Sequence, residues 1–381
     1  MCERAAAVDS VYQEKKDCCG CKSCQNVCPA HAIRMVPDEY GFEYPVIDRS
    51  ACVDCGKCRT VCPMLHANGR PPDEAFAVVL DDDAVNRSAS GGAFYALAKA
   101  FLEEGGVVFG CAFDEHLVAR HVEIGNVADL GKTQGSKYVQ SDMDCHRRVL
   151  ELLKSGKPVL FSGTPCQVAA IRAFSEPVGN GLTTVDLVCH GVPNAGLWKD
   201  YVAFLGKKHN GTITGFAFRA KGNRSPFWTK YKVETRGKSR EFKLPSVLSS
   251  YYHAFLKGKT YRQSCYACPF ACANRSSDVT VCDFWGYKGT MFRGQTAVSA
   301  VLIQGPKGKR LFEMGRKHLS VEPSDFAAVA RKNEQLQKPS ARKKFDEHFL
   351  RIWKEKGVAE LERRQWRQHW KASLLHMLGW L

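Results

Sequence analysis

One stretch of this chain occurs twice and decides its fold: residues 18–29 read CCGCKSCQNVCP, and residues 52–63 read CVDCGKCRTVCP. In each copy three cysteines stand two residues apart, and a fourth follows three residues later, directly before a proline. Three thiols in so short a run can bind one metal centre, while the fourth lies beyond a turn. A repeat of 34 residues therefore indicates two metal centres in a small N-terminal domain, residues 10–68.

This spacing is typical of the bacterial two-cluster ferredoxins, in which the fourth cysteine of each run binds the other cluster. It predicts two [4Fe–4S] clusters, one held by Cys18, Cys21, Cys24 and Cys62, and one held by Cys52, Cys55, Cys58 and Cys28. Structural zinc is the alternative, but zinc sites usually pair one CxxC with a distant second pair. Cys19 is surplus, and we interpret it as a small apolar residue or spare thiol. Short strands are expected at 32–36 and 42–46.

Composition sets limits on the rest of the 381 residues. Eighteen cysteines without an apolar leader or a long apolar run predict metal-bound or catalytic thiols in the cytoplasm and no transmembrane segment. The net charge of +16 suits acidic partners, but the basic residues are spread along the chain. This pattern favours a solvated basic surface over nucleic-acid binding.

After a linker at 69–72, predicted strands alternate with helices. Strands are expected at 75–80, 107–113, 117–124, 159–161 and 184–188, and helices at 91–104, 147–154, 166–174 and 197–205. This order predicts an α/β body with a largely parallel central portion, in two parts at 73–158 and 159–325. A basic helical tail follows at 326–381, which we expect to pack on protein, with peripheral contact to a membrane surface as the alternative.

Two of the predicted strands are followed by cysteines. Cys166 falls in the first turn of a helix, whose N-terminus favours a thiolate, and Cys189 follows the next strand, before a helix that Asn194 can cap. Ligands of open α/β sheets bind beyond the carboxyl ends of the strands, so both thiols are expected to face one crevice. Two unrelated buried thiols are the alternative.

A third cysteine group supplies Cys265 and Cys268, too few for a tetrahedral site alone. Together with Cys166 and Cys189 they would make four ligands for a third cluster or another metal. Cys272 and Cys282 compete for the same role. A redox-active dithiol and a structural thiol loop remain the alternatives.

Taken in order, these and other short segments resemble the coenzyme F420 hydrogenase/dehydrogenase beta-subunit family over about residues 16–350. The matching segments are SASGG at 88–92, SKYVQS at 136–141, GTPCQ at 163–167, DLVCHGVP at 186–193, CxxC at 265–268, NRxxD at 274–278 and DFWG at 283–286. Cys282 stands where the family usually has glycine. That departure leaves the conformation of this turn open and adds a candidate ligand.

The resemblance implies a flavin-binding α/β body, with FAD fed by iron–sulfur clusters. Family members oxidise or reduce F420, or reduce unsaturated bonds in chlorophyll precursors, and many have no assigned substrate. Backbone N–H groups at a helix start suit a pyrophosphate, whereas an ordinary GxGxxG site is missing. The candidate cofactor-binding residues are Ser90, Gly91, Gly92, Lys137, Thr164 and Gln167, and the candidate catalytic residues are Cys166 and His190. An ordinary surface lysine and a loop histidine are the alternatives for Lys137 and His190.

These features predict an iron–sulfur flavoprotein oxidoreductase with a redox partner and a small-molecule substrate. The alternative is a non-catalytic subunit that relays electrons to a partner enzyme. Nucleic-acid binding with structural clusters is a third hypothesis, and we do not expect it.

Overall fold

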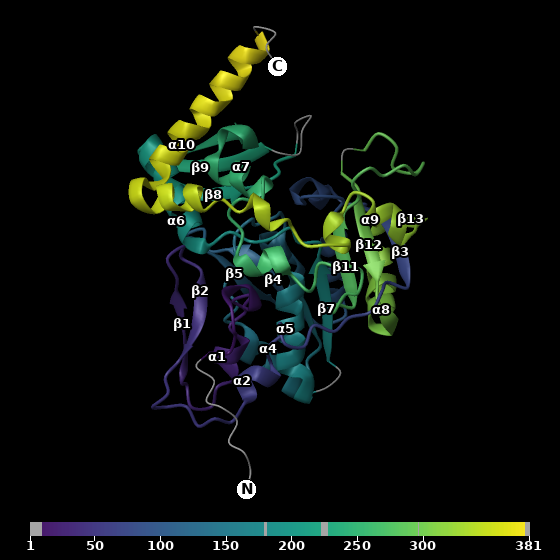
Figure 1. Ribbon diagram of the computed structural model, residues 1–381. Coiled ribbons are helices and arrows are strands. Elements are labelled where there is room, and N and C mark those ends of the chain that lie inside the picture. Colours follow the sequence, from purple (N-terminus) through teal and green to yellow (C-terminus); the bar gives the residue numbers. More distant parts are fainter. Residues whose placement is uncertain (1–9, 179–180, 222–227, 296, 378–381) are drawn as a thin grey trace.

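A mixed sheet of eight strands forms the centre of the molecule in the computed structural model, which describes residues 10–178, 181–221, 228–295 and 297–377 (Figure 1). The strand order is β13-β3-β12-β11-β7-β6-β4-β5. The strands are β3 (Glu74–Leu80), β4 (Val107–Phe113), β5 (Ala119–Ile124), β6 (Val159–Gly163), β7 (Leu182–Leu187), β11 (Val279–Asp283), β12 (Ser299–Ile303) and β13 (Leu319–Ser324).

The four central strands β4, β6, β7 and β11 run parallel, and the flanking strands are antiparallel. The predicted parallel central portion is therefore confirmed. Strand β3, from the start of the body, lies between β12 and β13 from its end. The two expected parts of the body thus share one sheet.

Helices cover both faces of this sheet. On one face α3 (Ala93–Glu103) packs against α8 (Gly305–Arg316), and on the other α4 (His146–Lys154) packs against α5 (Pro165–Ser175). Neighbouring residues of β6 show the alternation, because Leu160 belongs to the first core and Phe161 to the second. Strands covered on both faces read as continuous apolar runs, which is why β6 was recognisable from its sequence.

A second, smaller sheet covers part of the body, and the sequence analysis did not predict it. Strands β8 (Thr212–Ala217), β9 (Trp228–Thr235) and β10 (Lys238–Pro245) form a small antiparallel sheet. They enclose an aromatic core with α6 (Ala195–His209), α7 (Ser250–Leu256) and the first part of α10 (Glu347–Met377). As predicted, the Asn194 side chain caps α6, accepting a hydrogen bond from the Leu197 amide at 2.7 Å.

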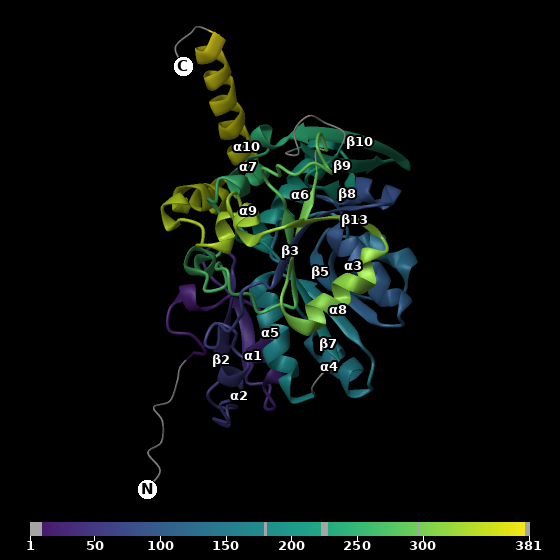
Figure 2. The same ribbon diagram turned by 90° about the vertical axis from the view of Figure 1, so that its right-hand side faces the viewer.

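The N-terminal segment contains helices α1 (Ser23–Val27) and α2 (Lys57–Thr60) and an antiparallel hairpin of β1 (Ile33–Pro37) and β2 (Glu43–Ile47). It lies against α4 and α5 (Figure 2). Ser23 contacts His146 at 2.9 Å, and the Lys22 ammonium contacts Asp142 at 2.6 Å. These contacts join the segment directly to the body.

The C-terminal region starts with α9 (Phe326–Ala330) and ends in α10, which is interrupted at Gly357 with φ of 75°. Before and just after this point Trp353 and Leu361 are buried in the aromatic core, so the start of the tail packs on protein as expected. Further on, α10 projects from the body and Trp370 is exposed (Figure 1). No helix within the described ranges is both long and apolar enough to cross a membrane.

Cysteine centres and an adjoining pocket

The first group of thiols combines both halves of the repeat. Cys18, Cys21, Cys24 and Cys62 line one small cavity. The pKa of Cys24 is raised by burial and further by the neighbouring thiols, among them Cys62. Burial also raises the pKa of Cys62 to about 11, with Cys21 and Cys18 as its thiol neighbours. Cys62 therefore lies with the three cysteines of the other run, the arrangement that the spacing predicted.

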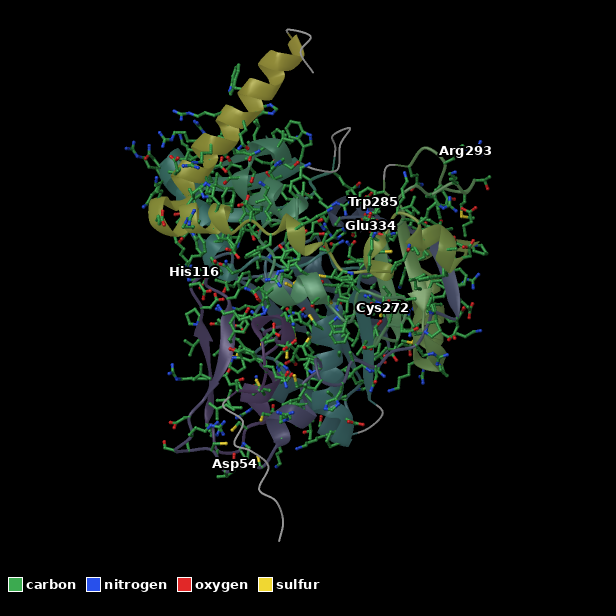
Figure 3. The ribbon with its side chains drawn as sticks, in the orientation of Figure 1. Asp54, His116, Cys272, Trp285, Arg293 and Glu334 are labelled. Carbon is green, nitrogen blue, oxygen red and sulfur yellow. The ribbon has the colours of Figure 1, made fainter. Side chains whose placement is uncertain are left out.

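The second group lies at the outer end of the molecule. Burial raises the pKa of Cys58, and Cys55 and Cys52 add to the effect as its neighbours. Cys28 and Cys58 pack against the same small apolar cluster. Cys55 is exposed, and the adjacent Asp54 marks this end of the molecule in Figure 3. This group is accordingly the one most open to solvent.

A third group forms in the body. Cys166, Cys189, Cys265 and Cys268 line one cavity of about 40 Å³. Burial raises the pKa of Cys189 well above its usual value, and the other three thiols act on it as neighbours. Burial likewise raises the pKa values of Cys265 and Cys268 to about 12. Four thiols that converge on one cavity supply the soft ligands that an iron-bearing centre takes.

The two competing cysteines lie elsewhere. The Cys272 thiol donates to the carbonyl oxygen of Asn274 at 3.1 Å, and Cys282 lines a different pocket, described below. Among the described residues, no three His, Cys, Asp or Glu side chains are arranged to hold one metal ion. A cubane instead spreads its four thiolates over four irons.

A buried ion pair holds the loop of the third group in place. Arg275 contacts Asp186 at 3.0 Å, and both side chains are at most 1% exposed. Arg275 also donates to the carbonyl oxygens of Phe270 at 2.8 Å and Leu187 at 3.1 Å. Two residues from the segments that carry the family resemblance therefore join the cysteine loop to the end of β7.

Cys19 lies between the first and third groups. Its thiol interacts with the thiols of Cys166 and Cys21, and these interactions, with burial, raise its pKa well above the usual value. Cys19 therefore stays protonated and donates, and the bond it makes lowers the pKa of Cys21 to about 6. Met64 lines both cavities. The two groups of thiols are thus close neighbours, separated by single side chains.

A larger pocket of about 300 Å³ adjoins the third group. Thr164, Cys189 and His190 line both cavities. Five of the six predicted cofactor-binding residues line the larger pocket, namely Ser90, Gly92, Lys137, Thr164 and Gln167. Gly91 does not. A Cβ atom there would lie 2.5 Å from the carbonyl oxygen of Val78, so this glycine allows α3 to approach the sheet.

The lining of this pocket includes the cationic side chains of Lys137 and Arg219, and Lys221 lies close by. Lys137 donates to the Gln134 carbonyl oxygen at 2.8 Å, and burial lowers its pKa to about 8. Lys221 donates to the Ser90 carbonyl oxygen at 2.8 Å. The start of α3 at Gly92, with φ of 86°, adds free backbone N–H groups. Such a lining suits an anionic group, a phosphate above all.

Sequence reasoning missed a polar network on the pocket wall. His121 contacts the Ser162 carbonyl oxygen at 3.0 Å and the Ser141 hydroxyl at 3.3 Å, and the Gln167 amide donates to that hydroxyl at 2.9 Å. Burial lowers the pKa of His121 to about 4, so its ring is neutral. Alternate residues of β5 face inward, and this alternation was the signal in the sequence that could have placed His121 inside. Arg219 and Trp285, which form a cation–π pair at 5.2 Å, were missed as well.

Comparisons with known proteins agree with the two-part organisation. Residues 17–65 match the 4Fe-4S dicluster domain, and residues 156–327 match the C terminus of the coenzyme F420 hydrogenase/dehydrogenase beta subunit. Among solved structures, a chain of the xenon-derivatised F420-reducing [NiFe] hydrogenase complex from Methanosarcina barkeri is similar, at 16% identity and a TM-score of 0.46. The alignment covers 78% of this chain and 91% of that chain. No curated protein matches.

The class is therefore an iron–sulfur protein, with a ferredoxin-like segment ahead of a mixed α/β body. More particularly, residues 156–327 match the C-terminal domain of the coenzyme F420 hydrogenase/dehydrogenase beta-subunit family, and a 4Fe-4S dicluster domain precedes them at residues 17–65. The resemblance recognised in the sequence is confirmed.

Proposed function

We propose that this chain is an iron–sulfur flavoprotein oxidoreductase that passes electrons between a surface partner and a substrate bound in the body. The observation that carries the proposal is the succession of sites. The exposed group at Cys55 is followed by the first group, then by Cys19, then by the third group, which shares Cys189 with the larger pocket.

The residues that would hold each cofactor follow from this arrangement. The eight ferredoxin cysteines would hold two [4Fe–4S] clusters, and Cys166, Cys189, Cys265 and Cys268 would hold a third. The pocket around Lys137 and the start of α3 would hold FAD, with its phosphates at the cationic end. When bound, clusters exchange single electrons and a flavin exchanges two, so the chain would convert between one- and two-electron chemistry.

The pocket favours an enzyme over a bare relay. A protein that only relays electrons needs no concave site with a neutral buried histidine, yet His121 forms part of the wall. Its Nδ1 accepts from Ser141, so the ring is held in one tautomer with Nε2 protonated against the Ser162 carbonyl oxygen. His190, one of the predicted catalytic residues, lines the same pocket.

The partner would dock at the second group. There Cys55 is exposed, Val53 is 65% exposed, and Lys57 and Arg59 are exposed on α2. An exposed apolar side chain near two exposed cations suits a small acidic redox protein, for which the charges would speed association. We place this exchange in the cytoplasm, because free thiols in such number need a reducing compartment.

The test is iron and flavin content per chain after anaerobic purification. We expect about twelve irons and one FAD. Cys189→Ser should lower the iron to about eight, whereas Cys272→Ser, outside the third group, should leave it at about twelve.

About eight irons in the unaltered chain would overturn the third centre. No flavin, even after FAD is added, would overturn the flavoenzyme and leave the relay. Turnover of a small-molecule acceptor by the isolated chain, with dithionite as electron donor, would separate the enzyme from a relay that needs its partner.

A further inference from the structure

Arg262 is a buried cation at the junction between the ferredoxin segment and the body. Its side chain is among the largest that are fully buried, and the residue is 1% exposed. It directly precedes the 3-10 turn at Gln263–Ala267, which contains Cys265. Its backbone amide donates to the Val192 carbonyl oxygen at 2.9 Å, which fixes its position in the body.

The guanidinium reaches into the ferredoxin segment. Its Nε donates to the Cys18 carbonyl oxygen at 2.6 Å, and its Nη2 donates to the Glu43 carbonyl oxygen at 2.7 Å and lies 3.5 Å from the Cys18 sulfur. The group also lies over the Tyr44 ring, 4.2 Å from its centroid. Planar donors of this kind fix geometry more tightly than a lysine does.

The Cys18 thiol, 3.5 Å from Nη2, is the neighbour of this guanidinium that can carry a negative charge. The other strong neighbours, Tyr44 and Cys19, are neutral because their pKa values are raised, and in the described part of the chain no carboxylate forms an ion pair with Arg262. A buried charge without an opposite charge is strongly destabilising, so a buried cation indicates that an anion is bound beside it. With a cluster bound, the thiolates of the first group would be that anion, because Cys18 is one of them.

We infer that Arg262 is a positioning residue for electron flow: it raises the reduction potential of the first centre (Cys18, Cys21, Cys24, Cys62) above that of the second (Cys52, Cys55, Cys58, Cys28). The inference rests on the proposed function only for the two ferredoxin centres. With both clusters bound, a single electron would pass from the second centre, which is oxidised, to the first, which is reduced, and no bond or proton would change.

The physical reason is the difference in surroundings. Adding an electron to the first centre adds negative charge beside a cation in a medium of low dielectric constant, where the attraction is strong. The cations near the second centre, Lys57 and Arg59, are exposed, so water and salt screen them. The arrangement therefore draws an electron inward from the partner surface toward the body.

The experiment is a redox titration of the anaerobically purified full chain, with both ferredoxin centres followed by electron paramagnetic resonance. In Arg262→Gln we expect the ratio of reduced to oxidised first centre, at one fixed potential, to fall at least tenfold. For a one-electron couple this corresponds to about 59 mV. Arg262→Lys keeps the charge and should shift the ratio less. Arg59→Gln, the exposed control, should leave both centres within about twofold of the unaltered chain.

A second variant covers the case in which Arg262→Gln does not fold. Gln140 accepts from the guanidinium at 3.4 Å, so Gln140→Glu places a carboxylate beside the cation and should lower the ratio for the first centre alone. Equal shifts at both centres, or no shift in either variant, would overturn the inference. Neither result depends on flavin or on the third centre, so this failure is distinct from failure of the flavoenzyme proposal.

Discussion

Arg275 and Asp186 form an ion pair at 3.0 Å from which water is almost entirely excluded. One residue lies next to the cysteine loop at 265–272, and the other lies near the end of the central strand β7. The pair therefore determines where two of the third-group thiols lie relative to Cys189.

Breaking this pair should be costly. Asp186→Asn leaves the guanidinium buried without a counter-charge, so the free energy of unfolding in urea should fall by about 3–5 kcal/mol. The exposed pair of Glu74 and Lys309 at 3.2 Å is the control, and Glu74→Gln should cost less than about 1 kcal/mol. The double variant Asp186→Leu, Arg275→Met should recover only part of the loss, because the carbonyl oxygens of Phe270 and Leu187 then lose their donor. A cost for Asp186→Asn as small as the control would show that the pair is not rigidly buried.

The crossed arrangement of the ferredoxin thiols predicts how iron losses combine. Cys62→Ala and Cys21→Ala remove ligands of one centre, so each variant and the double variant should all lose about four irons. Cys62→Ala combined with Cys55→Ala removes a ligand from each centre and should lose about eight. Iron analysis by colorimetric assay distinguishes the outcomes. If the Cys62 and Cys21 double variant lost about eight irons and the Cys62 and Cys55 double variant only about four, Cys62 would bind the same centre as its own run.

Lys137 predicts a pH dependence of flavin binding. Burial holds its pKa at about 8, so it is charged below that pH and neutral above it. The affinity for added FAD should therefore fall by roughly fivefold between pH 7 and pH 9, because a charge-assisted contact of about 1.5 kcal/mol goes from about nine-tenths to about one-tenth formed. Lys137→Met should bind weakly at both pH values. Lys132→Gln, at a side chain 64% exposed, should keep the unaltered profile. A flat profile in the unaltered chain would place the phosphates away from Lys137.

Part of the loss of folding stability at acid pH should come from His146. Burial lowers its pKa to about 4, whereas an unfolded histidine has a pKa near 6.5. The unfolded chain binds more protons between these values, so stability is lost as the pH falls through that window.

The gap in unfolding free energy between the unaltered chain and His146→Gln should narrow by about 1.5 kcal/mol from pH 6.5 to pH 5.0. His116→Gln, 80% exposed at the surface (Figure 3), is the control and should show no narrowing. Parallel curves for all three proteins would contradict the neutral state of His146.

Much of this fold could be predicted from local sequence patterns. The central strands were recognisable because burial on both faces makes them uninterrupted apolar runs, as in β6. The thiol groups were recognisable because ligand spacing is set by the metal centre and not by the rest of the fold. The sheet of β8 to β10 was missed, although β9 alternates between buried and half-exposed positions, because β10 is largely exposed and shows no buried face.

Sequence analysis missed several site residues for the same reason. Arg262 reaches Cys18 across 244 positions of sequence, and nothing near it distinguishes it from any other arginine. His121 joins Ser162 in the same way, through a contact between separate strands. Cys19 looked surplus beside Cys18, and only the fold shows that it also contacts Cys166. Charges and hydrogen bonds between distant segments leave no periodic pattern to detect.

The ferredoxin segment is fastened to the body at several points: Lys22 to Asp142, Ser23 to His146, and the carbonyl oxygens of Cys18 and Tyr40 to Arg262 and Asn194. It is therefore not a swinging arm that must travel between a donor and an acceptor. The separation between neighbouring thiol groups is set when the chain folds. Transfer inside the molecule should thus proceed at the same rate in water and in thick glycerol, and only the arrival of the outside carrier should slow with solvent viscosity.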